Sequence, residues 1–332
     1  MVVEPVGKIL LRNEGEHEET RMENLNERDW YRVLEAIHRG KCILLTGSDI
    51  VFEDNGSDGL SLPRRLARKL AESLPPETPA MTDDLAHVAQ LRYRKDGDRS
   101  DLEFEVQEFF APLATQTSEF HRDLAVLPFS LCLTTTPDNF MAQAFLEAGK
   151  PPIQNFYHFR KHRSVDLSKS MPSEPILYGL FGHLDEPDSL VLTETDLLEY
   201  LVNVVRGTPL LPPFIAGQLA DPQTSFLFLG FGFQQWYARV LLHVLQTFGH
   251  RNRSLAVEVA SFFIHPDSQR TALFLNKRIR SNFASSHGGS SRRSYANAME
   301  REIRNRRCRS LLPKHPRCSS VMTVGTAARW WR

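Results

Sequence analysis

Long apolar runs are missing from this chain of 332 residues. No stretch approaches the ~18–20 apolar residues that a membrane-spanning helix needs, so we expect no membrane segment. The first residues lack a basic start followed by an apolar stretch, and they therefore predict no secretory signal. These two absences favour a cytoplasmic protein.

Cysteine is also scarce, and its spacing excludes the usual zinc modules. The four cysteines are Cys42, Cys132, Cys308 and Cys318, and none of them forms a CxxC pair. We therefore expect no zinc and no metal site; a site formed by Cys308, His315 and Cys318 stays open as a weak alternative, because their spacing matches no common zinc template. Cys42 and Cys132 lie inside apolar runs, which predicts small buried residues in a reducing compartment.

Net charge is absent as well, but the charges are unevenly distributed. The chain has 40 basic and 40 acidic residues. Residues 281–332 hold ten arginines and one lysine against two glutamates, a net of +9, so residues 1–280 carry −9. A basic segment of this kind binds nucleic acid through phosphates in some proteins and is a disordered tail in others. Both interpretations stay open for residues 281–332.

What the chain does have is an alternation of apolar strands and amphipathic helices. The strand-like runs are almost continuously apolar, which is typical of a parallel sheet buried on both faces. We predict an α/β fold with a doubly wound parallel sheet, Rossmann-like, with inserted helices between residues 62 and 126. The predicted strands include the ranges 41–52, 128–136, 153–159, 175–181, 225–232 and 255–266.

Four of these strands end in small, polar or glycine-rich residues. The ends read Thr46-Gly47-Ser48, Thr134-Thr135-Thr136, Phe181-Gly182-His183 and Gly230-Phe231-Gly232. In doubly wound sheets, ligands bind outside the carboxyl ends of the strands. We therefore expect these four ends to converge on one ligand site, although any single glycine could merely turn the chain.

The same segments resemble the sirtuin family, and the branch found in bacterial defence proteins most of all. The first motif is "LLTGSD", followed by the helical stretch "LPRRLARKLAE". "LTTTPDNFMAQAF" is similar to the family's Thr-x-Asn-x-Asp strand end, and "GHLDEPDSLVLT" to its His-Gly step and helix entry. "FLFLGFGFQQWYARVLL" is similar to a glycine segment of the defence branch. The resemblance covers residues 40–280.

The resemblance implies that NAD lies across the strand ends, as substrate or ligand. Family members cleave nicotinamide from the ribose, and the defence branch passes the ribosyl group to water. Without cysteine pairs, the zinc-containing deacylase type is not expected. The implied catalytic residues are Thr136, Asp138 and His183. The implied NAD-binding residues are Gly47, Ser48, Asp49, Asp138, Phe181, Gly182, Gly230, Phe231 and Gly232.

Three positions depart from the family pattern. Thr136 stands where the family has its catalytic Asn, Phe181 where it has its catalytic His, and Asp49 where it has a second glycine. His183 is expected to replace the missing base, because residues two apart in an extended strand point to the same side. Two functions follow: an NAD hydrolase of anti-phage defence, or a catalytically impaired module that binds NAD or ADP-ribose and regulates a partner.

The expected domain organisation has three parts. Residues 1–25 are a polar leader, residues 26–280 the NAD-binding domain and residues 281–332 a basic tail of low order. A further hypothesis is that this tail is an out-of-frame remnant of another domain. The expected partners are NAD, a second copy of the chain or a defence protein, and nucleic acid only through the tail.

Overall fold

The computed structural model describes residues 27–48, 50, 60–75, 83–163, 167, 170–232, 235–247, 254–259 and 281–286. The chain divides into two compact units, Met1–His287 and Gly288–Arg332, and the second lies outside the described residues. The predicted leader and most of the predicted tail lie outside them too. None of the described helices has both the length and the apolar character needed to cross a bilayer.

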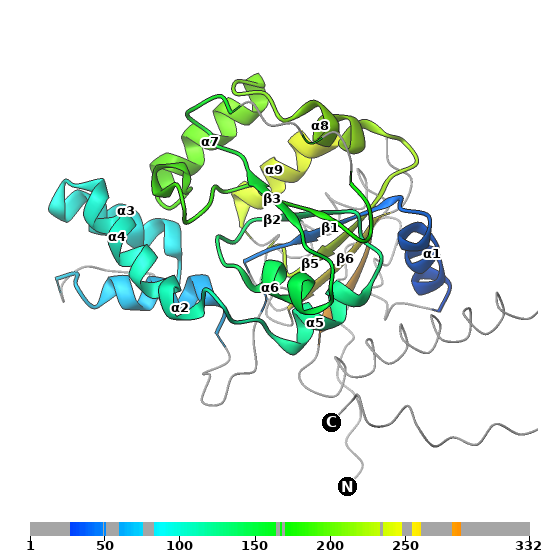
Figure 1. Cartoon of the computed structure of the whole chain (residues 1–332). Helices are drawn as coiled ribbons and strands as arrows, with labels where there is room; N and C mark the ends of the chain where they lie inside the picture. The colour runs from blue at the N-terminus through cyan, green and yellow to red at the C-terminus, as the bar shows by residue number, and fades with distance from the viewer. Residues whose placement is uncertain are drawn as a thin grey trace, which may run out of the picture. The chain divides into compact units, whose positions relative to one another are not determined.

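The first unit is built on a parallel sheet with the strand order β3-β4-β2-β1-β5-β6-β7 (Figure 1). Every neighbouring pair in this order is parallel. The predicted doubly wound parallel sheet is thereby confirmed. The strands of the described chain are β1 (Cys42–Thr46), β2 (Leu131–Thr134), β3 (Ile153–Phe156), β4 (Ile176–Gly179), β5 (Ser225–Leu229), β6 (Ser254–Val259) and β7 (Ser281–Ser286).

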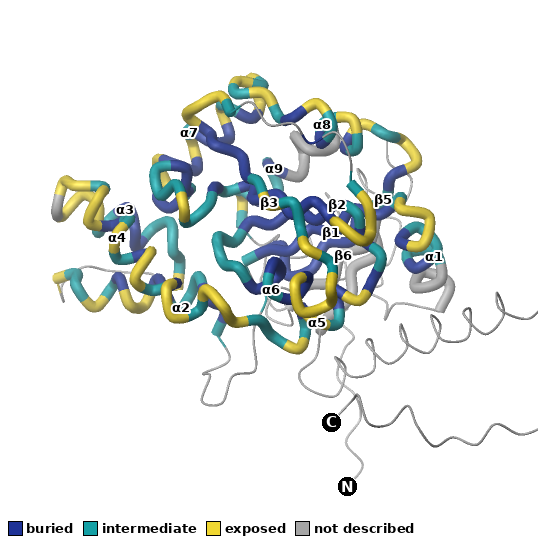
Figure 2. Tube along the Cα trace, viewed as in Figure 1, coloured by how far each residue is buried: buried dark blue, intermediate teal, exposed yellow. Residues whose placement is uncertain are grey.

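Helices cover both faces of this sheet. Alternate strand residues such as Ile43, Leu45 and Tyr178 join one buried cluster with side chains of α7 (Glu194–Arg206), α8 (Pro213–Ala220) and α9 (Trp236–Thr247). Successive strand residues point to opposite faces, so Cys42 and Leu44 face the other side. Figure 1 shows α5 and α6 on that side, and Figure 2 shows the central strands buried. The bounds of the helices there are α1 (Glu27–His38), α5 (Glu119–Val126) and α6 (Phe140–Glu147).

The predicted burial of Cys42 and Cys132 is also confirmed. Both are free thiols with at most 3% of their surface exposed. Burial raises the pKa of the Cys42 thiol to about 12 and raises that of Cys132 as well. A thiol that stays protonated is a poor nucleophile and a poor metal ligand, so these residues serve packing.

The inserted helices form a second buried cluster beside the sheet. They are α2 (Leu62–Ala71), α3 (Leu85–Asp96) and α4 (Arg99–Phe110), which we call the helical module. Asp84 and Asp98 cap α3 and α4 by accepting backbone N–H bonds, as Asp does at helix starts. The module packs against Phe140 at the start of α6 and against Leu190 and Leu192.

A buried carboxylate ties this module to the sheet. Asp196 is 1% exposed and lies in the first turn of α7, where it forms a capping box with Thr193. Both of its oxygens accept bonds from Arg99 of α4, at 2.9 and 2.7 Å. Arg160, which follows β3, donates to it at 2.7 Å. The Asp196 network therefore joins α4, α7 and the segment after β3.

Residues 281–286 differ from the prediction of a low-order tail. They form β7, which pairs with β6 over Ser254–Val259. Pairing in a parallel sheet uses backbone groups, so a polar sequence can form such a strand. The prediction is therefore wrong for these residues, while the division of the remaining chain into leader, domain and tail stays a prediction.

Candidate functional site

Four strand ends meet along one edge of the sheet, as expected from the sequence. The N–H of Leu180 donates to Thr134 O at 2.7 Å, which joins the ends of β4 and β2. Thr135 N–H donates to Thr46 O at 3.1 Å and so joins β2 to β1. Gly47 N–H donates to Leu229 O at 3.0 Å and joins β1 to β5. We call the carboxyl ends of β4, β2, β1 and β5 the strand-tip edge.

Gly47 occupies the tightest position on this edge. A Cβ atom there would lie 2.3 Å from Phe231 Cα and 2.5 Å from Gly230 O. Glycine is therefore required for the packing of two backbone segments, whether or not a ligand binds. Ser48 is half-buried beside it, while Asp49 lies outside the described residues.

The segment after β5 completes the neighbouring part of the edge. Gly230 and Gly232 have φ values of 53° and 77°, in the left-handed region that favours glycine. Phe231 between them is 3% exposed and packs against Phe228, with ring centroids 5.4 Å apart. The aromatic ring thus contributes to the core, and the two glycines shape the backbone that faces Gly47.

Thr136 and Asp138 follow β2 in a turn that leads into α6. The hydroxyls of Thr134 and Thr136 lie 3.0 Å apart, and the N–H of Thr136 donates to the Thr134 hydroxyl at 3.2 Å. Asp138 Oδ1 accepts the N–H of Phe140 at 3.0 Å. The carboxylate therefore lies at the start of α6, where the helix dipole favours negative charge.

His121 of α5 is a residue of this site that the sequence did not single out. It is 4% exposed, and its Nδ1 lies 2.8 Å from the Ser118 hydroxyl. Its ring contacts Phe140 edge to face at 5.7 Å. Burial lowers the pKa of His121 to about 4, and the Asp138 carboxylate opposes part of this shift. No local pattern distinguishes His121 from an exposed helical histidine, so only the fold reveals it.

Acidification is expected to destabilise the protein through His121. Its folded-state pKa of about 4 lies below the ordinary 6.5. As the pH falls from 6.5 to 4, the unfolded chain binds a proton that the folded chain does not, so stability is lost in that window and kept above it. The loss attributable to His121 is about 3 kcal/mol.

Urea unfolding at several pH values measures this effect. His121→Gln is expected to flatten the dependence between pH 6.5 and 4, while His162→Gln, at an exposed position, is expected to leave it unchanged. Equal slopes in wild type and His121→Gln would contradict the assignment.

Phe181 and His183 do not share a direction, and this expectation was wrong. Strand β4 ends at Gly179, and Gly182 adopts a φ of 87°, so the chain is no longer extended between the two residues. Phe181 is half-buried and packs against Tyr200 of α7, with ring centroids 5.0 Å apart, at the margin of the buried cluster that includes α9. His183 instead stacks on Phe156 of β3 at 5.4 Å.

His183 is held by its own turn. Its Nδ1 accepts the N–H of Asp185 at 3.2 Å and lies 3.4 Å from the Asp185 carboxylate. Burial lowers the pKa of His183; Arg163 adds to this shift, while Asp185 and Glu186 oppose it. Gly182 is fixed as well, because a Cβ there would lie 2.2 Å from Ser189 O.

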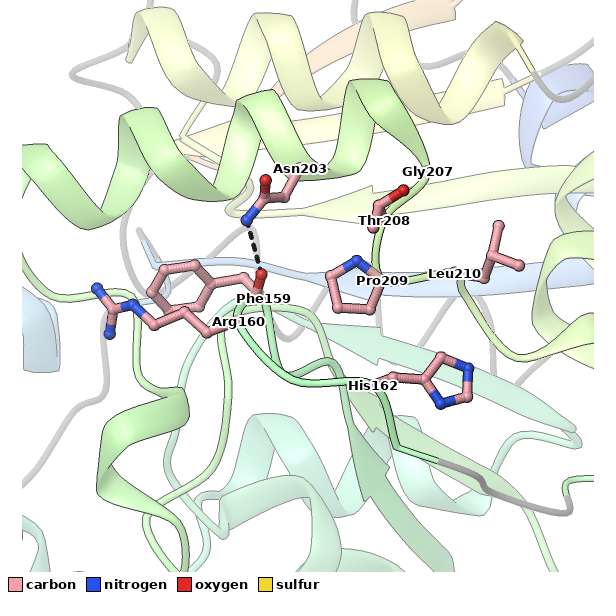
Figure 3. A pocket seen from close by; sticks show the side chains of 8 residues that line it. All are labelled: Phe159, Arg160, His162, Asn203, Gly207, Thr208, Pro209 and Leu210. Atoms are coloured by element: carbon pink, nitrogen blue, oxygen red, sulfur yellow. Dashed lines mark hydrogen bonds between the residues drawn. The ribbon is translucent and has the colours of Figure 1, made fainter.

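A pocket of about 670 Å³ lies elsewhere, beside β3 and the end of α7 (Figure 3). Figure 3 shows Asn203 of α7 donating to Phe159 O, at 2.8 Å, on one side of it. No residue predicted for the NAD site lines this pocket. Its lining consists of Phe159, Arg160, His162, Asn203, Gly207, Thr208, Pro209 and Leu210.

Comparisons with known proteins agree with this architecture. A family model described as SIR2-like domain matches residues 130–283. Over 204 residues the chain is 27% identical to the NAD(+) hydrolase ThsA of Enterococcus faecium. That match covers 61% of this chain and 39% of the relative, so the chain corresponds to well under half of that protein. Residues 130–283 therefore resemble a SIR2-like domain, and the predicted resemblance to the sirtuin-like family is confirmed.

Proposed function

We propose that the protein binds NAD at the strand-tip edge and hydrolyses it to release nicotinamide, in anti-phage defence in the cytoplasm. The observation that carries this proposal is the junction of four adjacent strand ends through backbone hydrogen bonds. A SIR2-like domain and a relative named as an NAD(+) hydrolase support the choice of substrate.

Each predicted residue has a role in this reaction. The bond between the nicotinamide nitrogen and the ribose carbon breaks, and its electron pair leaves with nicotinamide. Asp138 would stabilise the positive charge that develops on the ribose, and water would add to the ribose carbon and give a proton to His183. Thr136 would orient the ribose by hydrogen bonding. The backbone approach to NAD would use Gly47, Ser48, Asp49, Phe181, Gly182, Gly230, Phe231 and Gly232.

The second candidate function is a catalytically impaired module that binds NAD or ADP-ribose and regulates a partner. One observation favours it: the ring at the family's histidine position, Phe181, packs against Tyr200 at the margin of the core. The replacement base, His183, stacks on the other side of its turn against Phe156. Such a module would keep the fold and would still bind the ligand, but it would lose most of the rate of NAD hydrolysis.

The release of free nicotinamide from NAD by the purified full chain tests the first function. His183→Ala is expected to lower the initial rate about 100-fold, the lower end of what a general base contributes. His162→Ala, which removes an exposed histidine from the pocket of Figure 3, is expected to retain the wild-type rate.

Calorimetry with NAD separates the two functions. Nicotinamide release that depends on His183 supports the hydrolase. Binding of NAD without release, unchanged in His183→Ala, supports the impaired module, and the absence of both binding and release contradicts both. Self-association, a defence partner and nucleic-acid binding through the basic tail remain further proposals.

A further inference from the structure

The loop after β3 and the turn after β4 bring one histidine and two carboxylates together. The three residues are His158, Glu186 and Asp188, and their nitrogen and oxygen ligand atoms all lie within 4.8 Å of one another. We propose that this His158 cluster binds a divalent cation of the Mn²⁺ to Zn²⁺ series. The proposal does not depend on NAD hydrolysis, and the site differs in kind from the four-cysteine zinc module.

His158 provides the strongest reason for a ligand. Its side chain is fully buried, and its Nε2 makes no hydrogen bond within the described part of the chain. The nearest carboxylate oxygen, Asp188 Oδ2, is 3.5 Å away, at the outer limit of a hydrogen bond. A buried polar atom without a partner costs about 1–3 kcal/mol, and a bound cation would remove that cost.

The His158 ring can present Nε2 to a metal ion. Neutral imidazole is the form that binds metals. Nδ1 accepts the N–H of Arg160 at 3.3 Å. Coordination through Nε2 requires the ring proton on Nδ1, so this contact must be given up; it is long, and its loss is therefore a small cost.

The two carboxylates lie on a turn that is held by hydrogen bonds. The Ser189 hydroxyl accepts the N–H of His183 at 2.9 Å and donates to Glu186 O at 2.5 Å. With metal–ligand bonds of about 2.1 Å, tetrahedral ligand atoms lie about 3.4 Å apart. The ligand atoms here lie within 4.8 Å of one another, and rotation of the half-buried side chains of Glu186 and Asp188 can bring them to that closer spacing. Water can complete the coordination.

Two cations compete with the proposed metal ion. Lys161 bonds to Asp188, and Arg163 pairs with Glu186 at 3.1 Å. The Lys161 side chain is 63% exposed, and such surface pairs contribute about 0–1 kcal/mol. A doubly charged ion can therefore displace the lysine. It follows that removal of the Lys161 ammonium group should tighten metal binding.

The donor set also predicts selectivity. One imidazole nitrogen with two carboxylates suits Mn²⁺, Co²⁺ and Zn²⁺, whereas Ca²⁺ and Mg²⁺ prefer oxygen ligands alone. We therefore expect Co²⁺ and Zn²⁺ to bind more tightly than Ca²⁺.

Calorimetric titration of the chelator-treated full chain with Co²⁺ and Zn²⁺ tests the proposal. Asp188→Asn and Glu186→Gln are each expected to weaken Co²⁺ binding by about tenfold or more. The matched control is Asp185→Asn, which removes the same charge from the same turn at a carboxylate that is 88% exposed, and it should bind as wild type does. Lys161→Ala should bind several-fold more tightly.

The visible spectrum of the Co²⁺ complex provides a second readout, because coordination by nitrogen changes its absorption. His158→Gln is expected to abolish that band, provided that circular dichroism shows a folded protein. Any zinc bound by Cys308, Cys318 or His315 is common to all variants and cancels in the comparison. The proposal would be overturned if the wild type bound no Co²⁺ at about 1 mM Co²⁺. It would also be overturned if Asp188→Asn, Glu186→Gln and Asp185→Asn all bound Co²⁺ with the same affinity.

Discussion

Replacement of Gly47 by alanine is expected to lower the free energy of unfolding by about 3 kcal/mol or more. The new methyl group would lie 2.3 Å from Phe231 Cα and 2.5 Å from Gly230 O. Both are backbone atoms, so no side-chain rotation relieves the clash, and the ends of β1 and β5 must separate. The loss should appear without any nucleotide present, because the contact is internal to the fold.

Gly217→Ala is the matched control for this change. Gly217 lies within α8, and a Cβ there meets no atom within 4 Å. Alanine is a better helix former than glycine, so this variant should gain about 0.5–1 kcal/mol. Urea unfolding measures both variants. Stability of Gly47→Ala equal to wild type would show that the strand-tip edge is looser than described, and would assign the glycine to the ligand alone.

Replacement of Asp196 by alanine is expected to cost about 3–5 kcal/mol. The carboxylate is almost fully buried and accepts bonds from Arg99, Arg160 and the N–H groups of Leu192 and Thr193. Its removal leaves two backbone N–H groups without their acceptor and takes one carboxylate from two guanidinium groups, which keep their bonds to Glu103 and Glu199. The change is severe because it removes the carboxylate and leaves the arginines in place; replacing a whole buried ion pair by apolar residues would cost less.

An exposed ion pair provides the control for Asp196→Ala. Glu147 bonds to Arg122 at 2.7 Å, and both side chains are about half exposed. Glu147→Ala should therefore cost at most about 1 kcal/mol. Urea unfolding with both variants at pH 7 makes the comparison. A cost for Asp196→Ala no greater than that for Glu147→Ala would contradict the role of the Asp196 network.

The pH dependence has a defined sign for Asp196. Burial alone would raise its pKa, but Arg99, the Thr193 N–H and Arg160 outweigh it, so the folded-state pKa is lowered. The stability that Asp196 contributes is therefore present above the pKa of the unfolded carboxyl, and it is lost as the pH falls toward the folded value.

The sequence predicted the sheet well because each of its central strands is a nearly uninterrupted apolar run. Residues such as Leu44 and Cys132 are buried in strands covered on both faces, and that requirement is visible in the composition. The start of α7 has a local cause as well, since Thr193 and Asp196 cap it within four residues of the chain. The convergence of four strand ends followed from parallel pairing alone.

The directions of the site residues could not be predicted in the same way. The left-handed turn at Gly182 separates Phe181 from His183; glycine permits such a turn but does not require it, so the local sequence left both the turn and an extended step open. The burial of His121 depends on packing against Phe140, which is distant in sequence. β7 lacks apolar periodicity and is defined by its pairing with β6. These features arise from tertiary contacts rather than from local pattern.

The Asp196 network restricts how a ligand reaches the strand ends. Arg99, the first residue of α4, donates to both oxygens of Asp196 and to Leu190 O at 2.8 Å. These bonds from its guanidinium group fasten the helical module to the start of α7. A hinge opening between module and sheet would have to break all of these bonds at once. Entry and exit of the NAD that we propose for the strand-tip edge should therefore proceed by movement of individual loops, with the module and the sheet behaving as one rigid body.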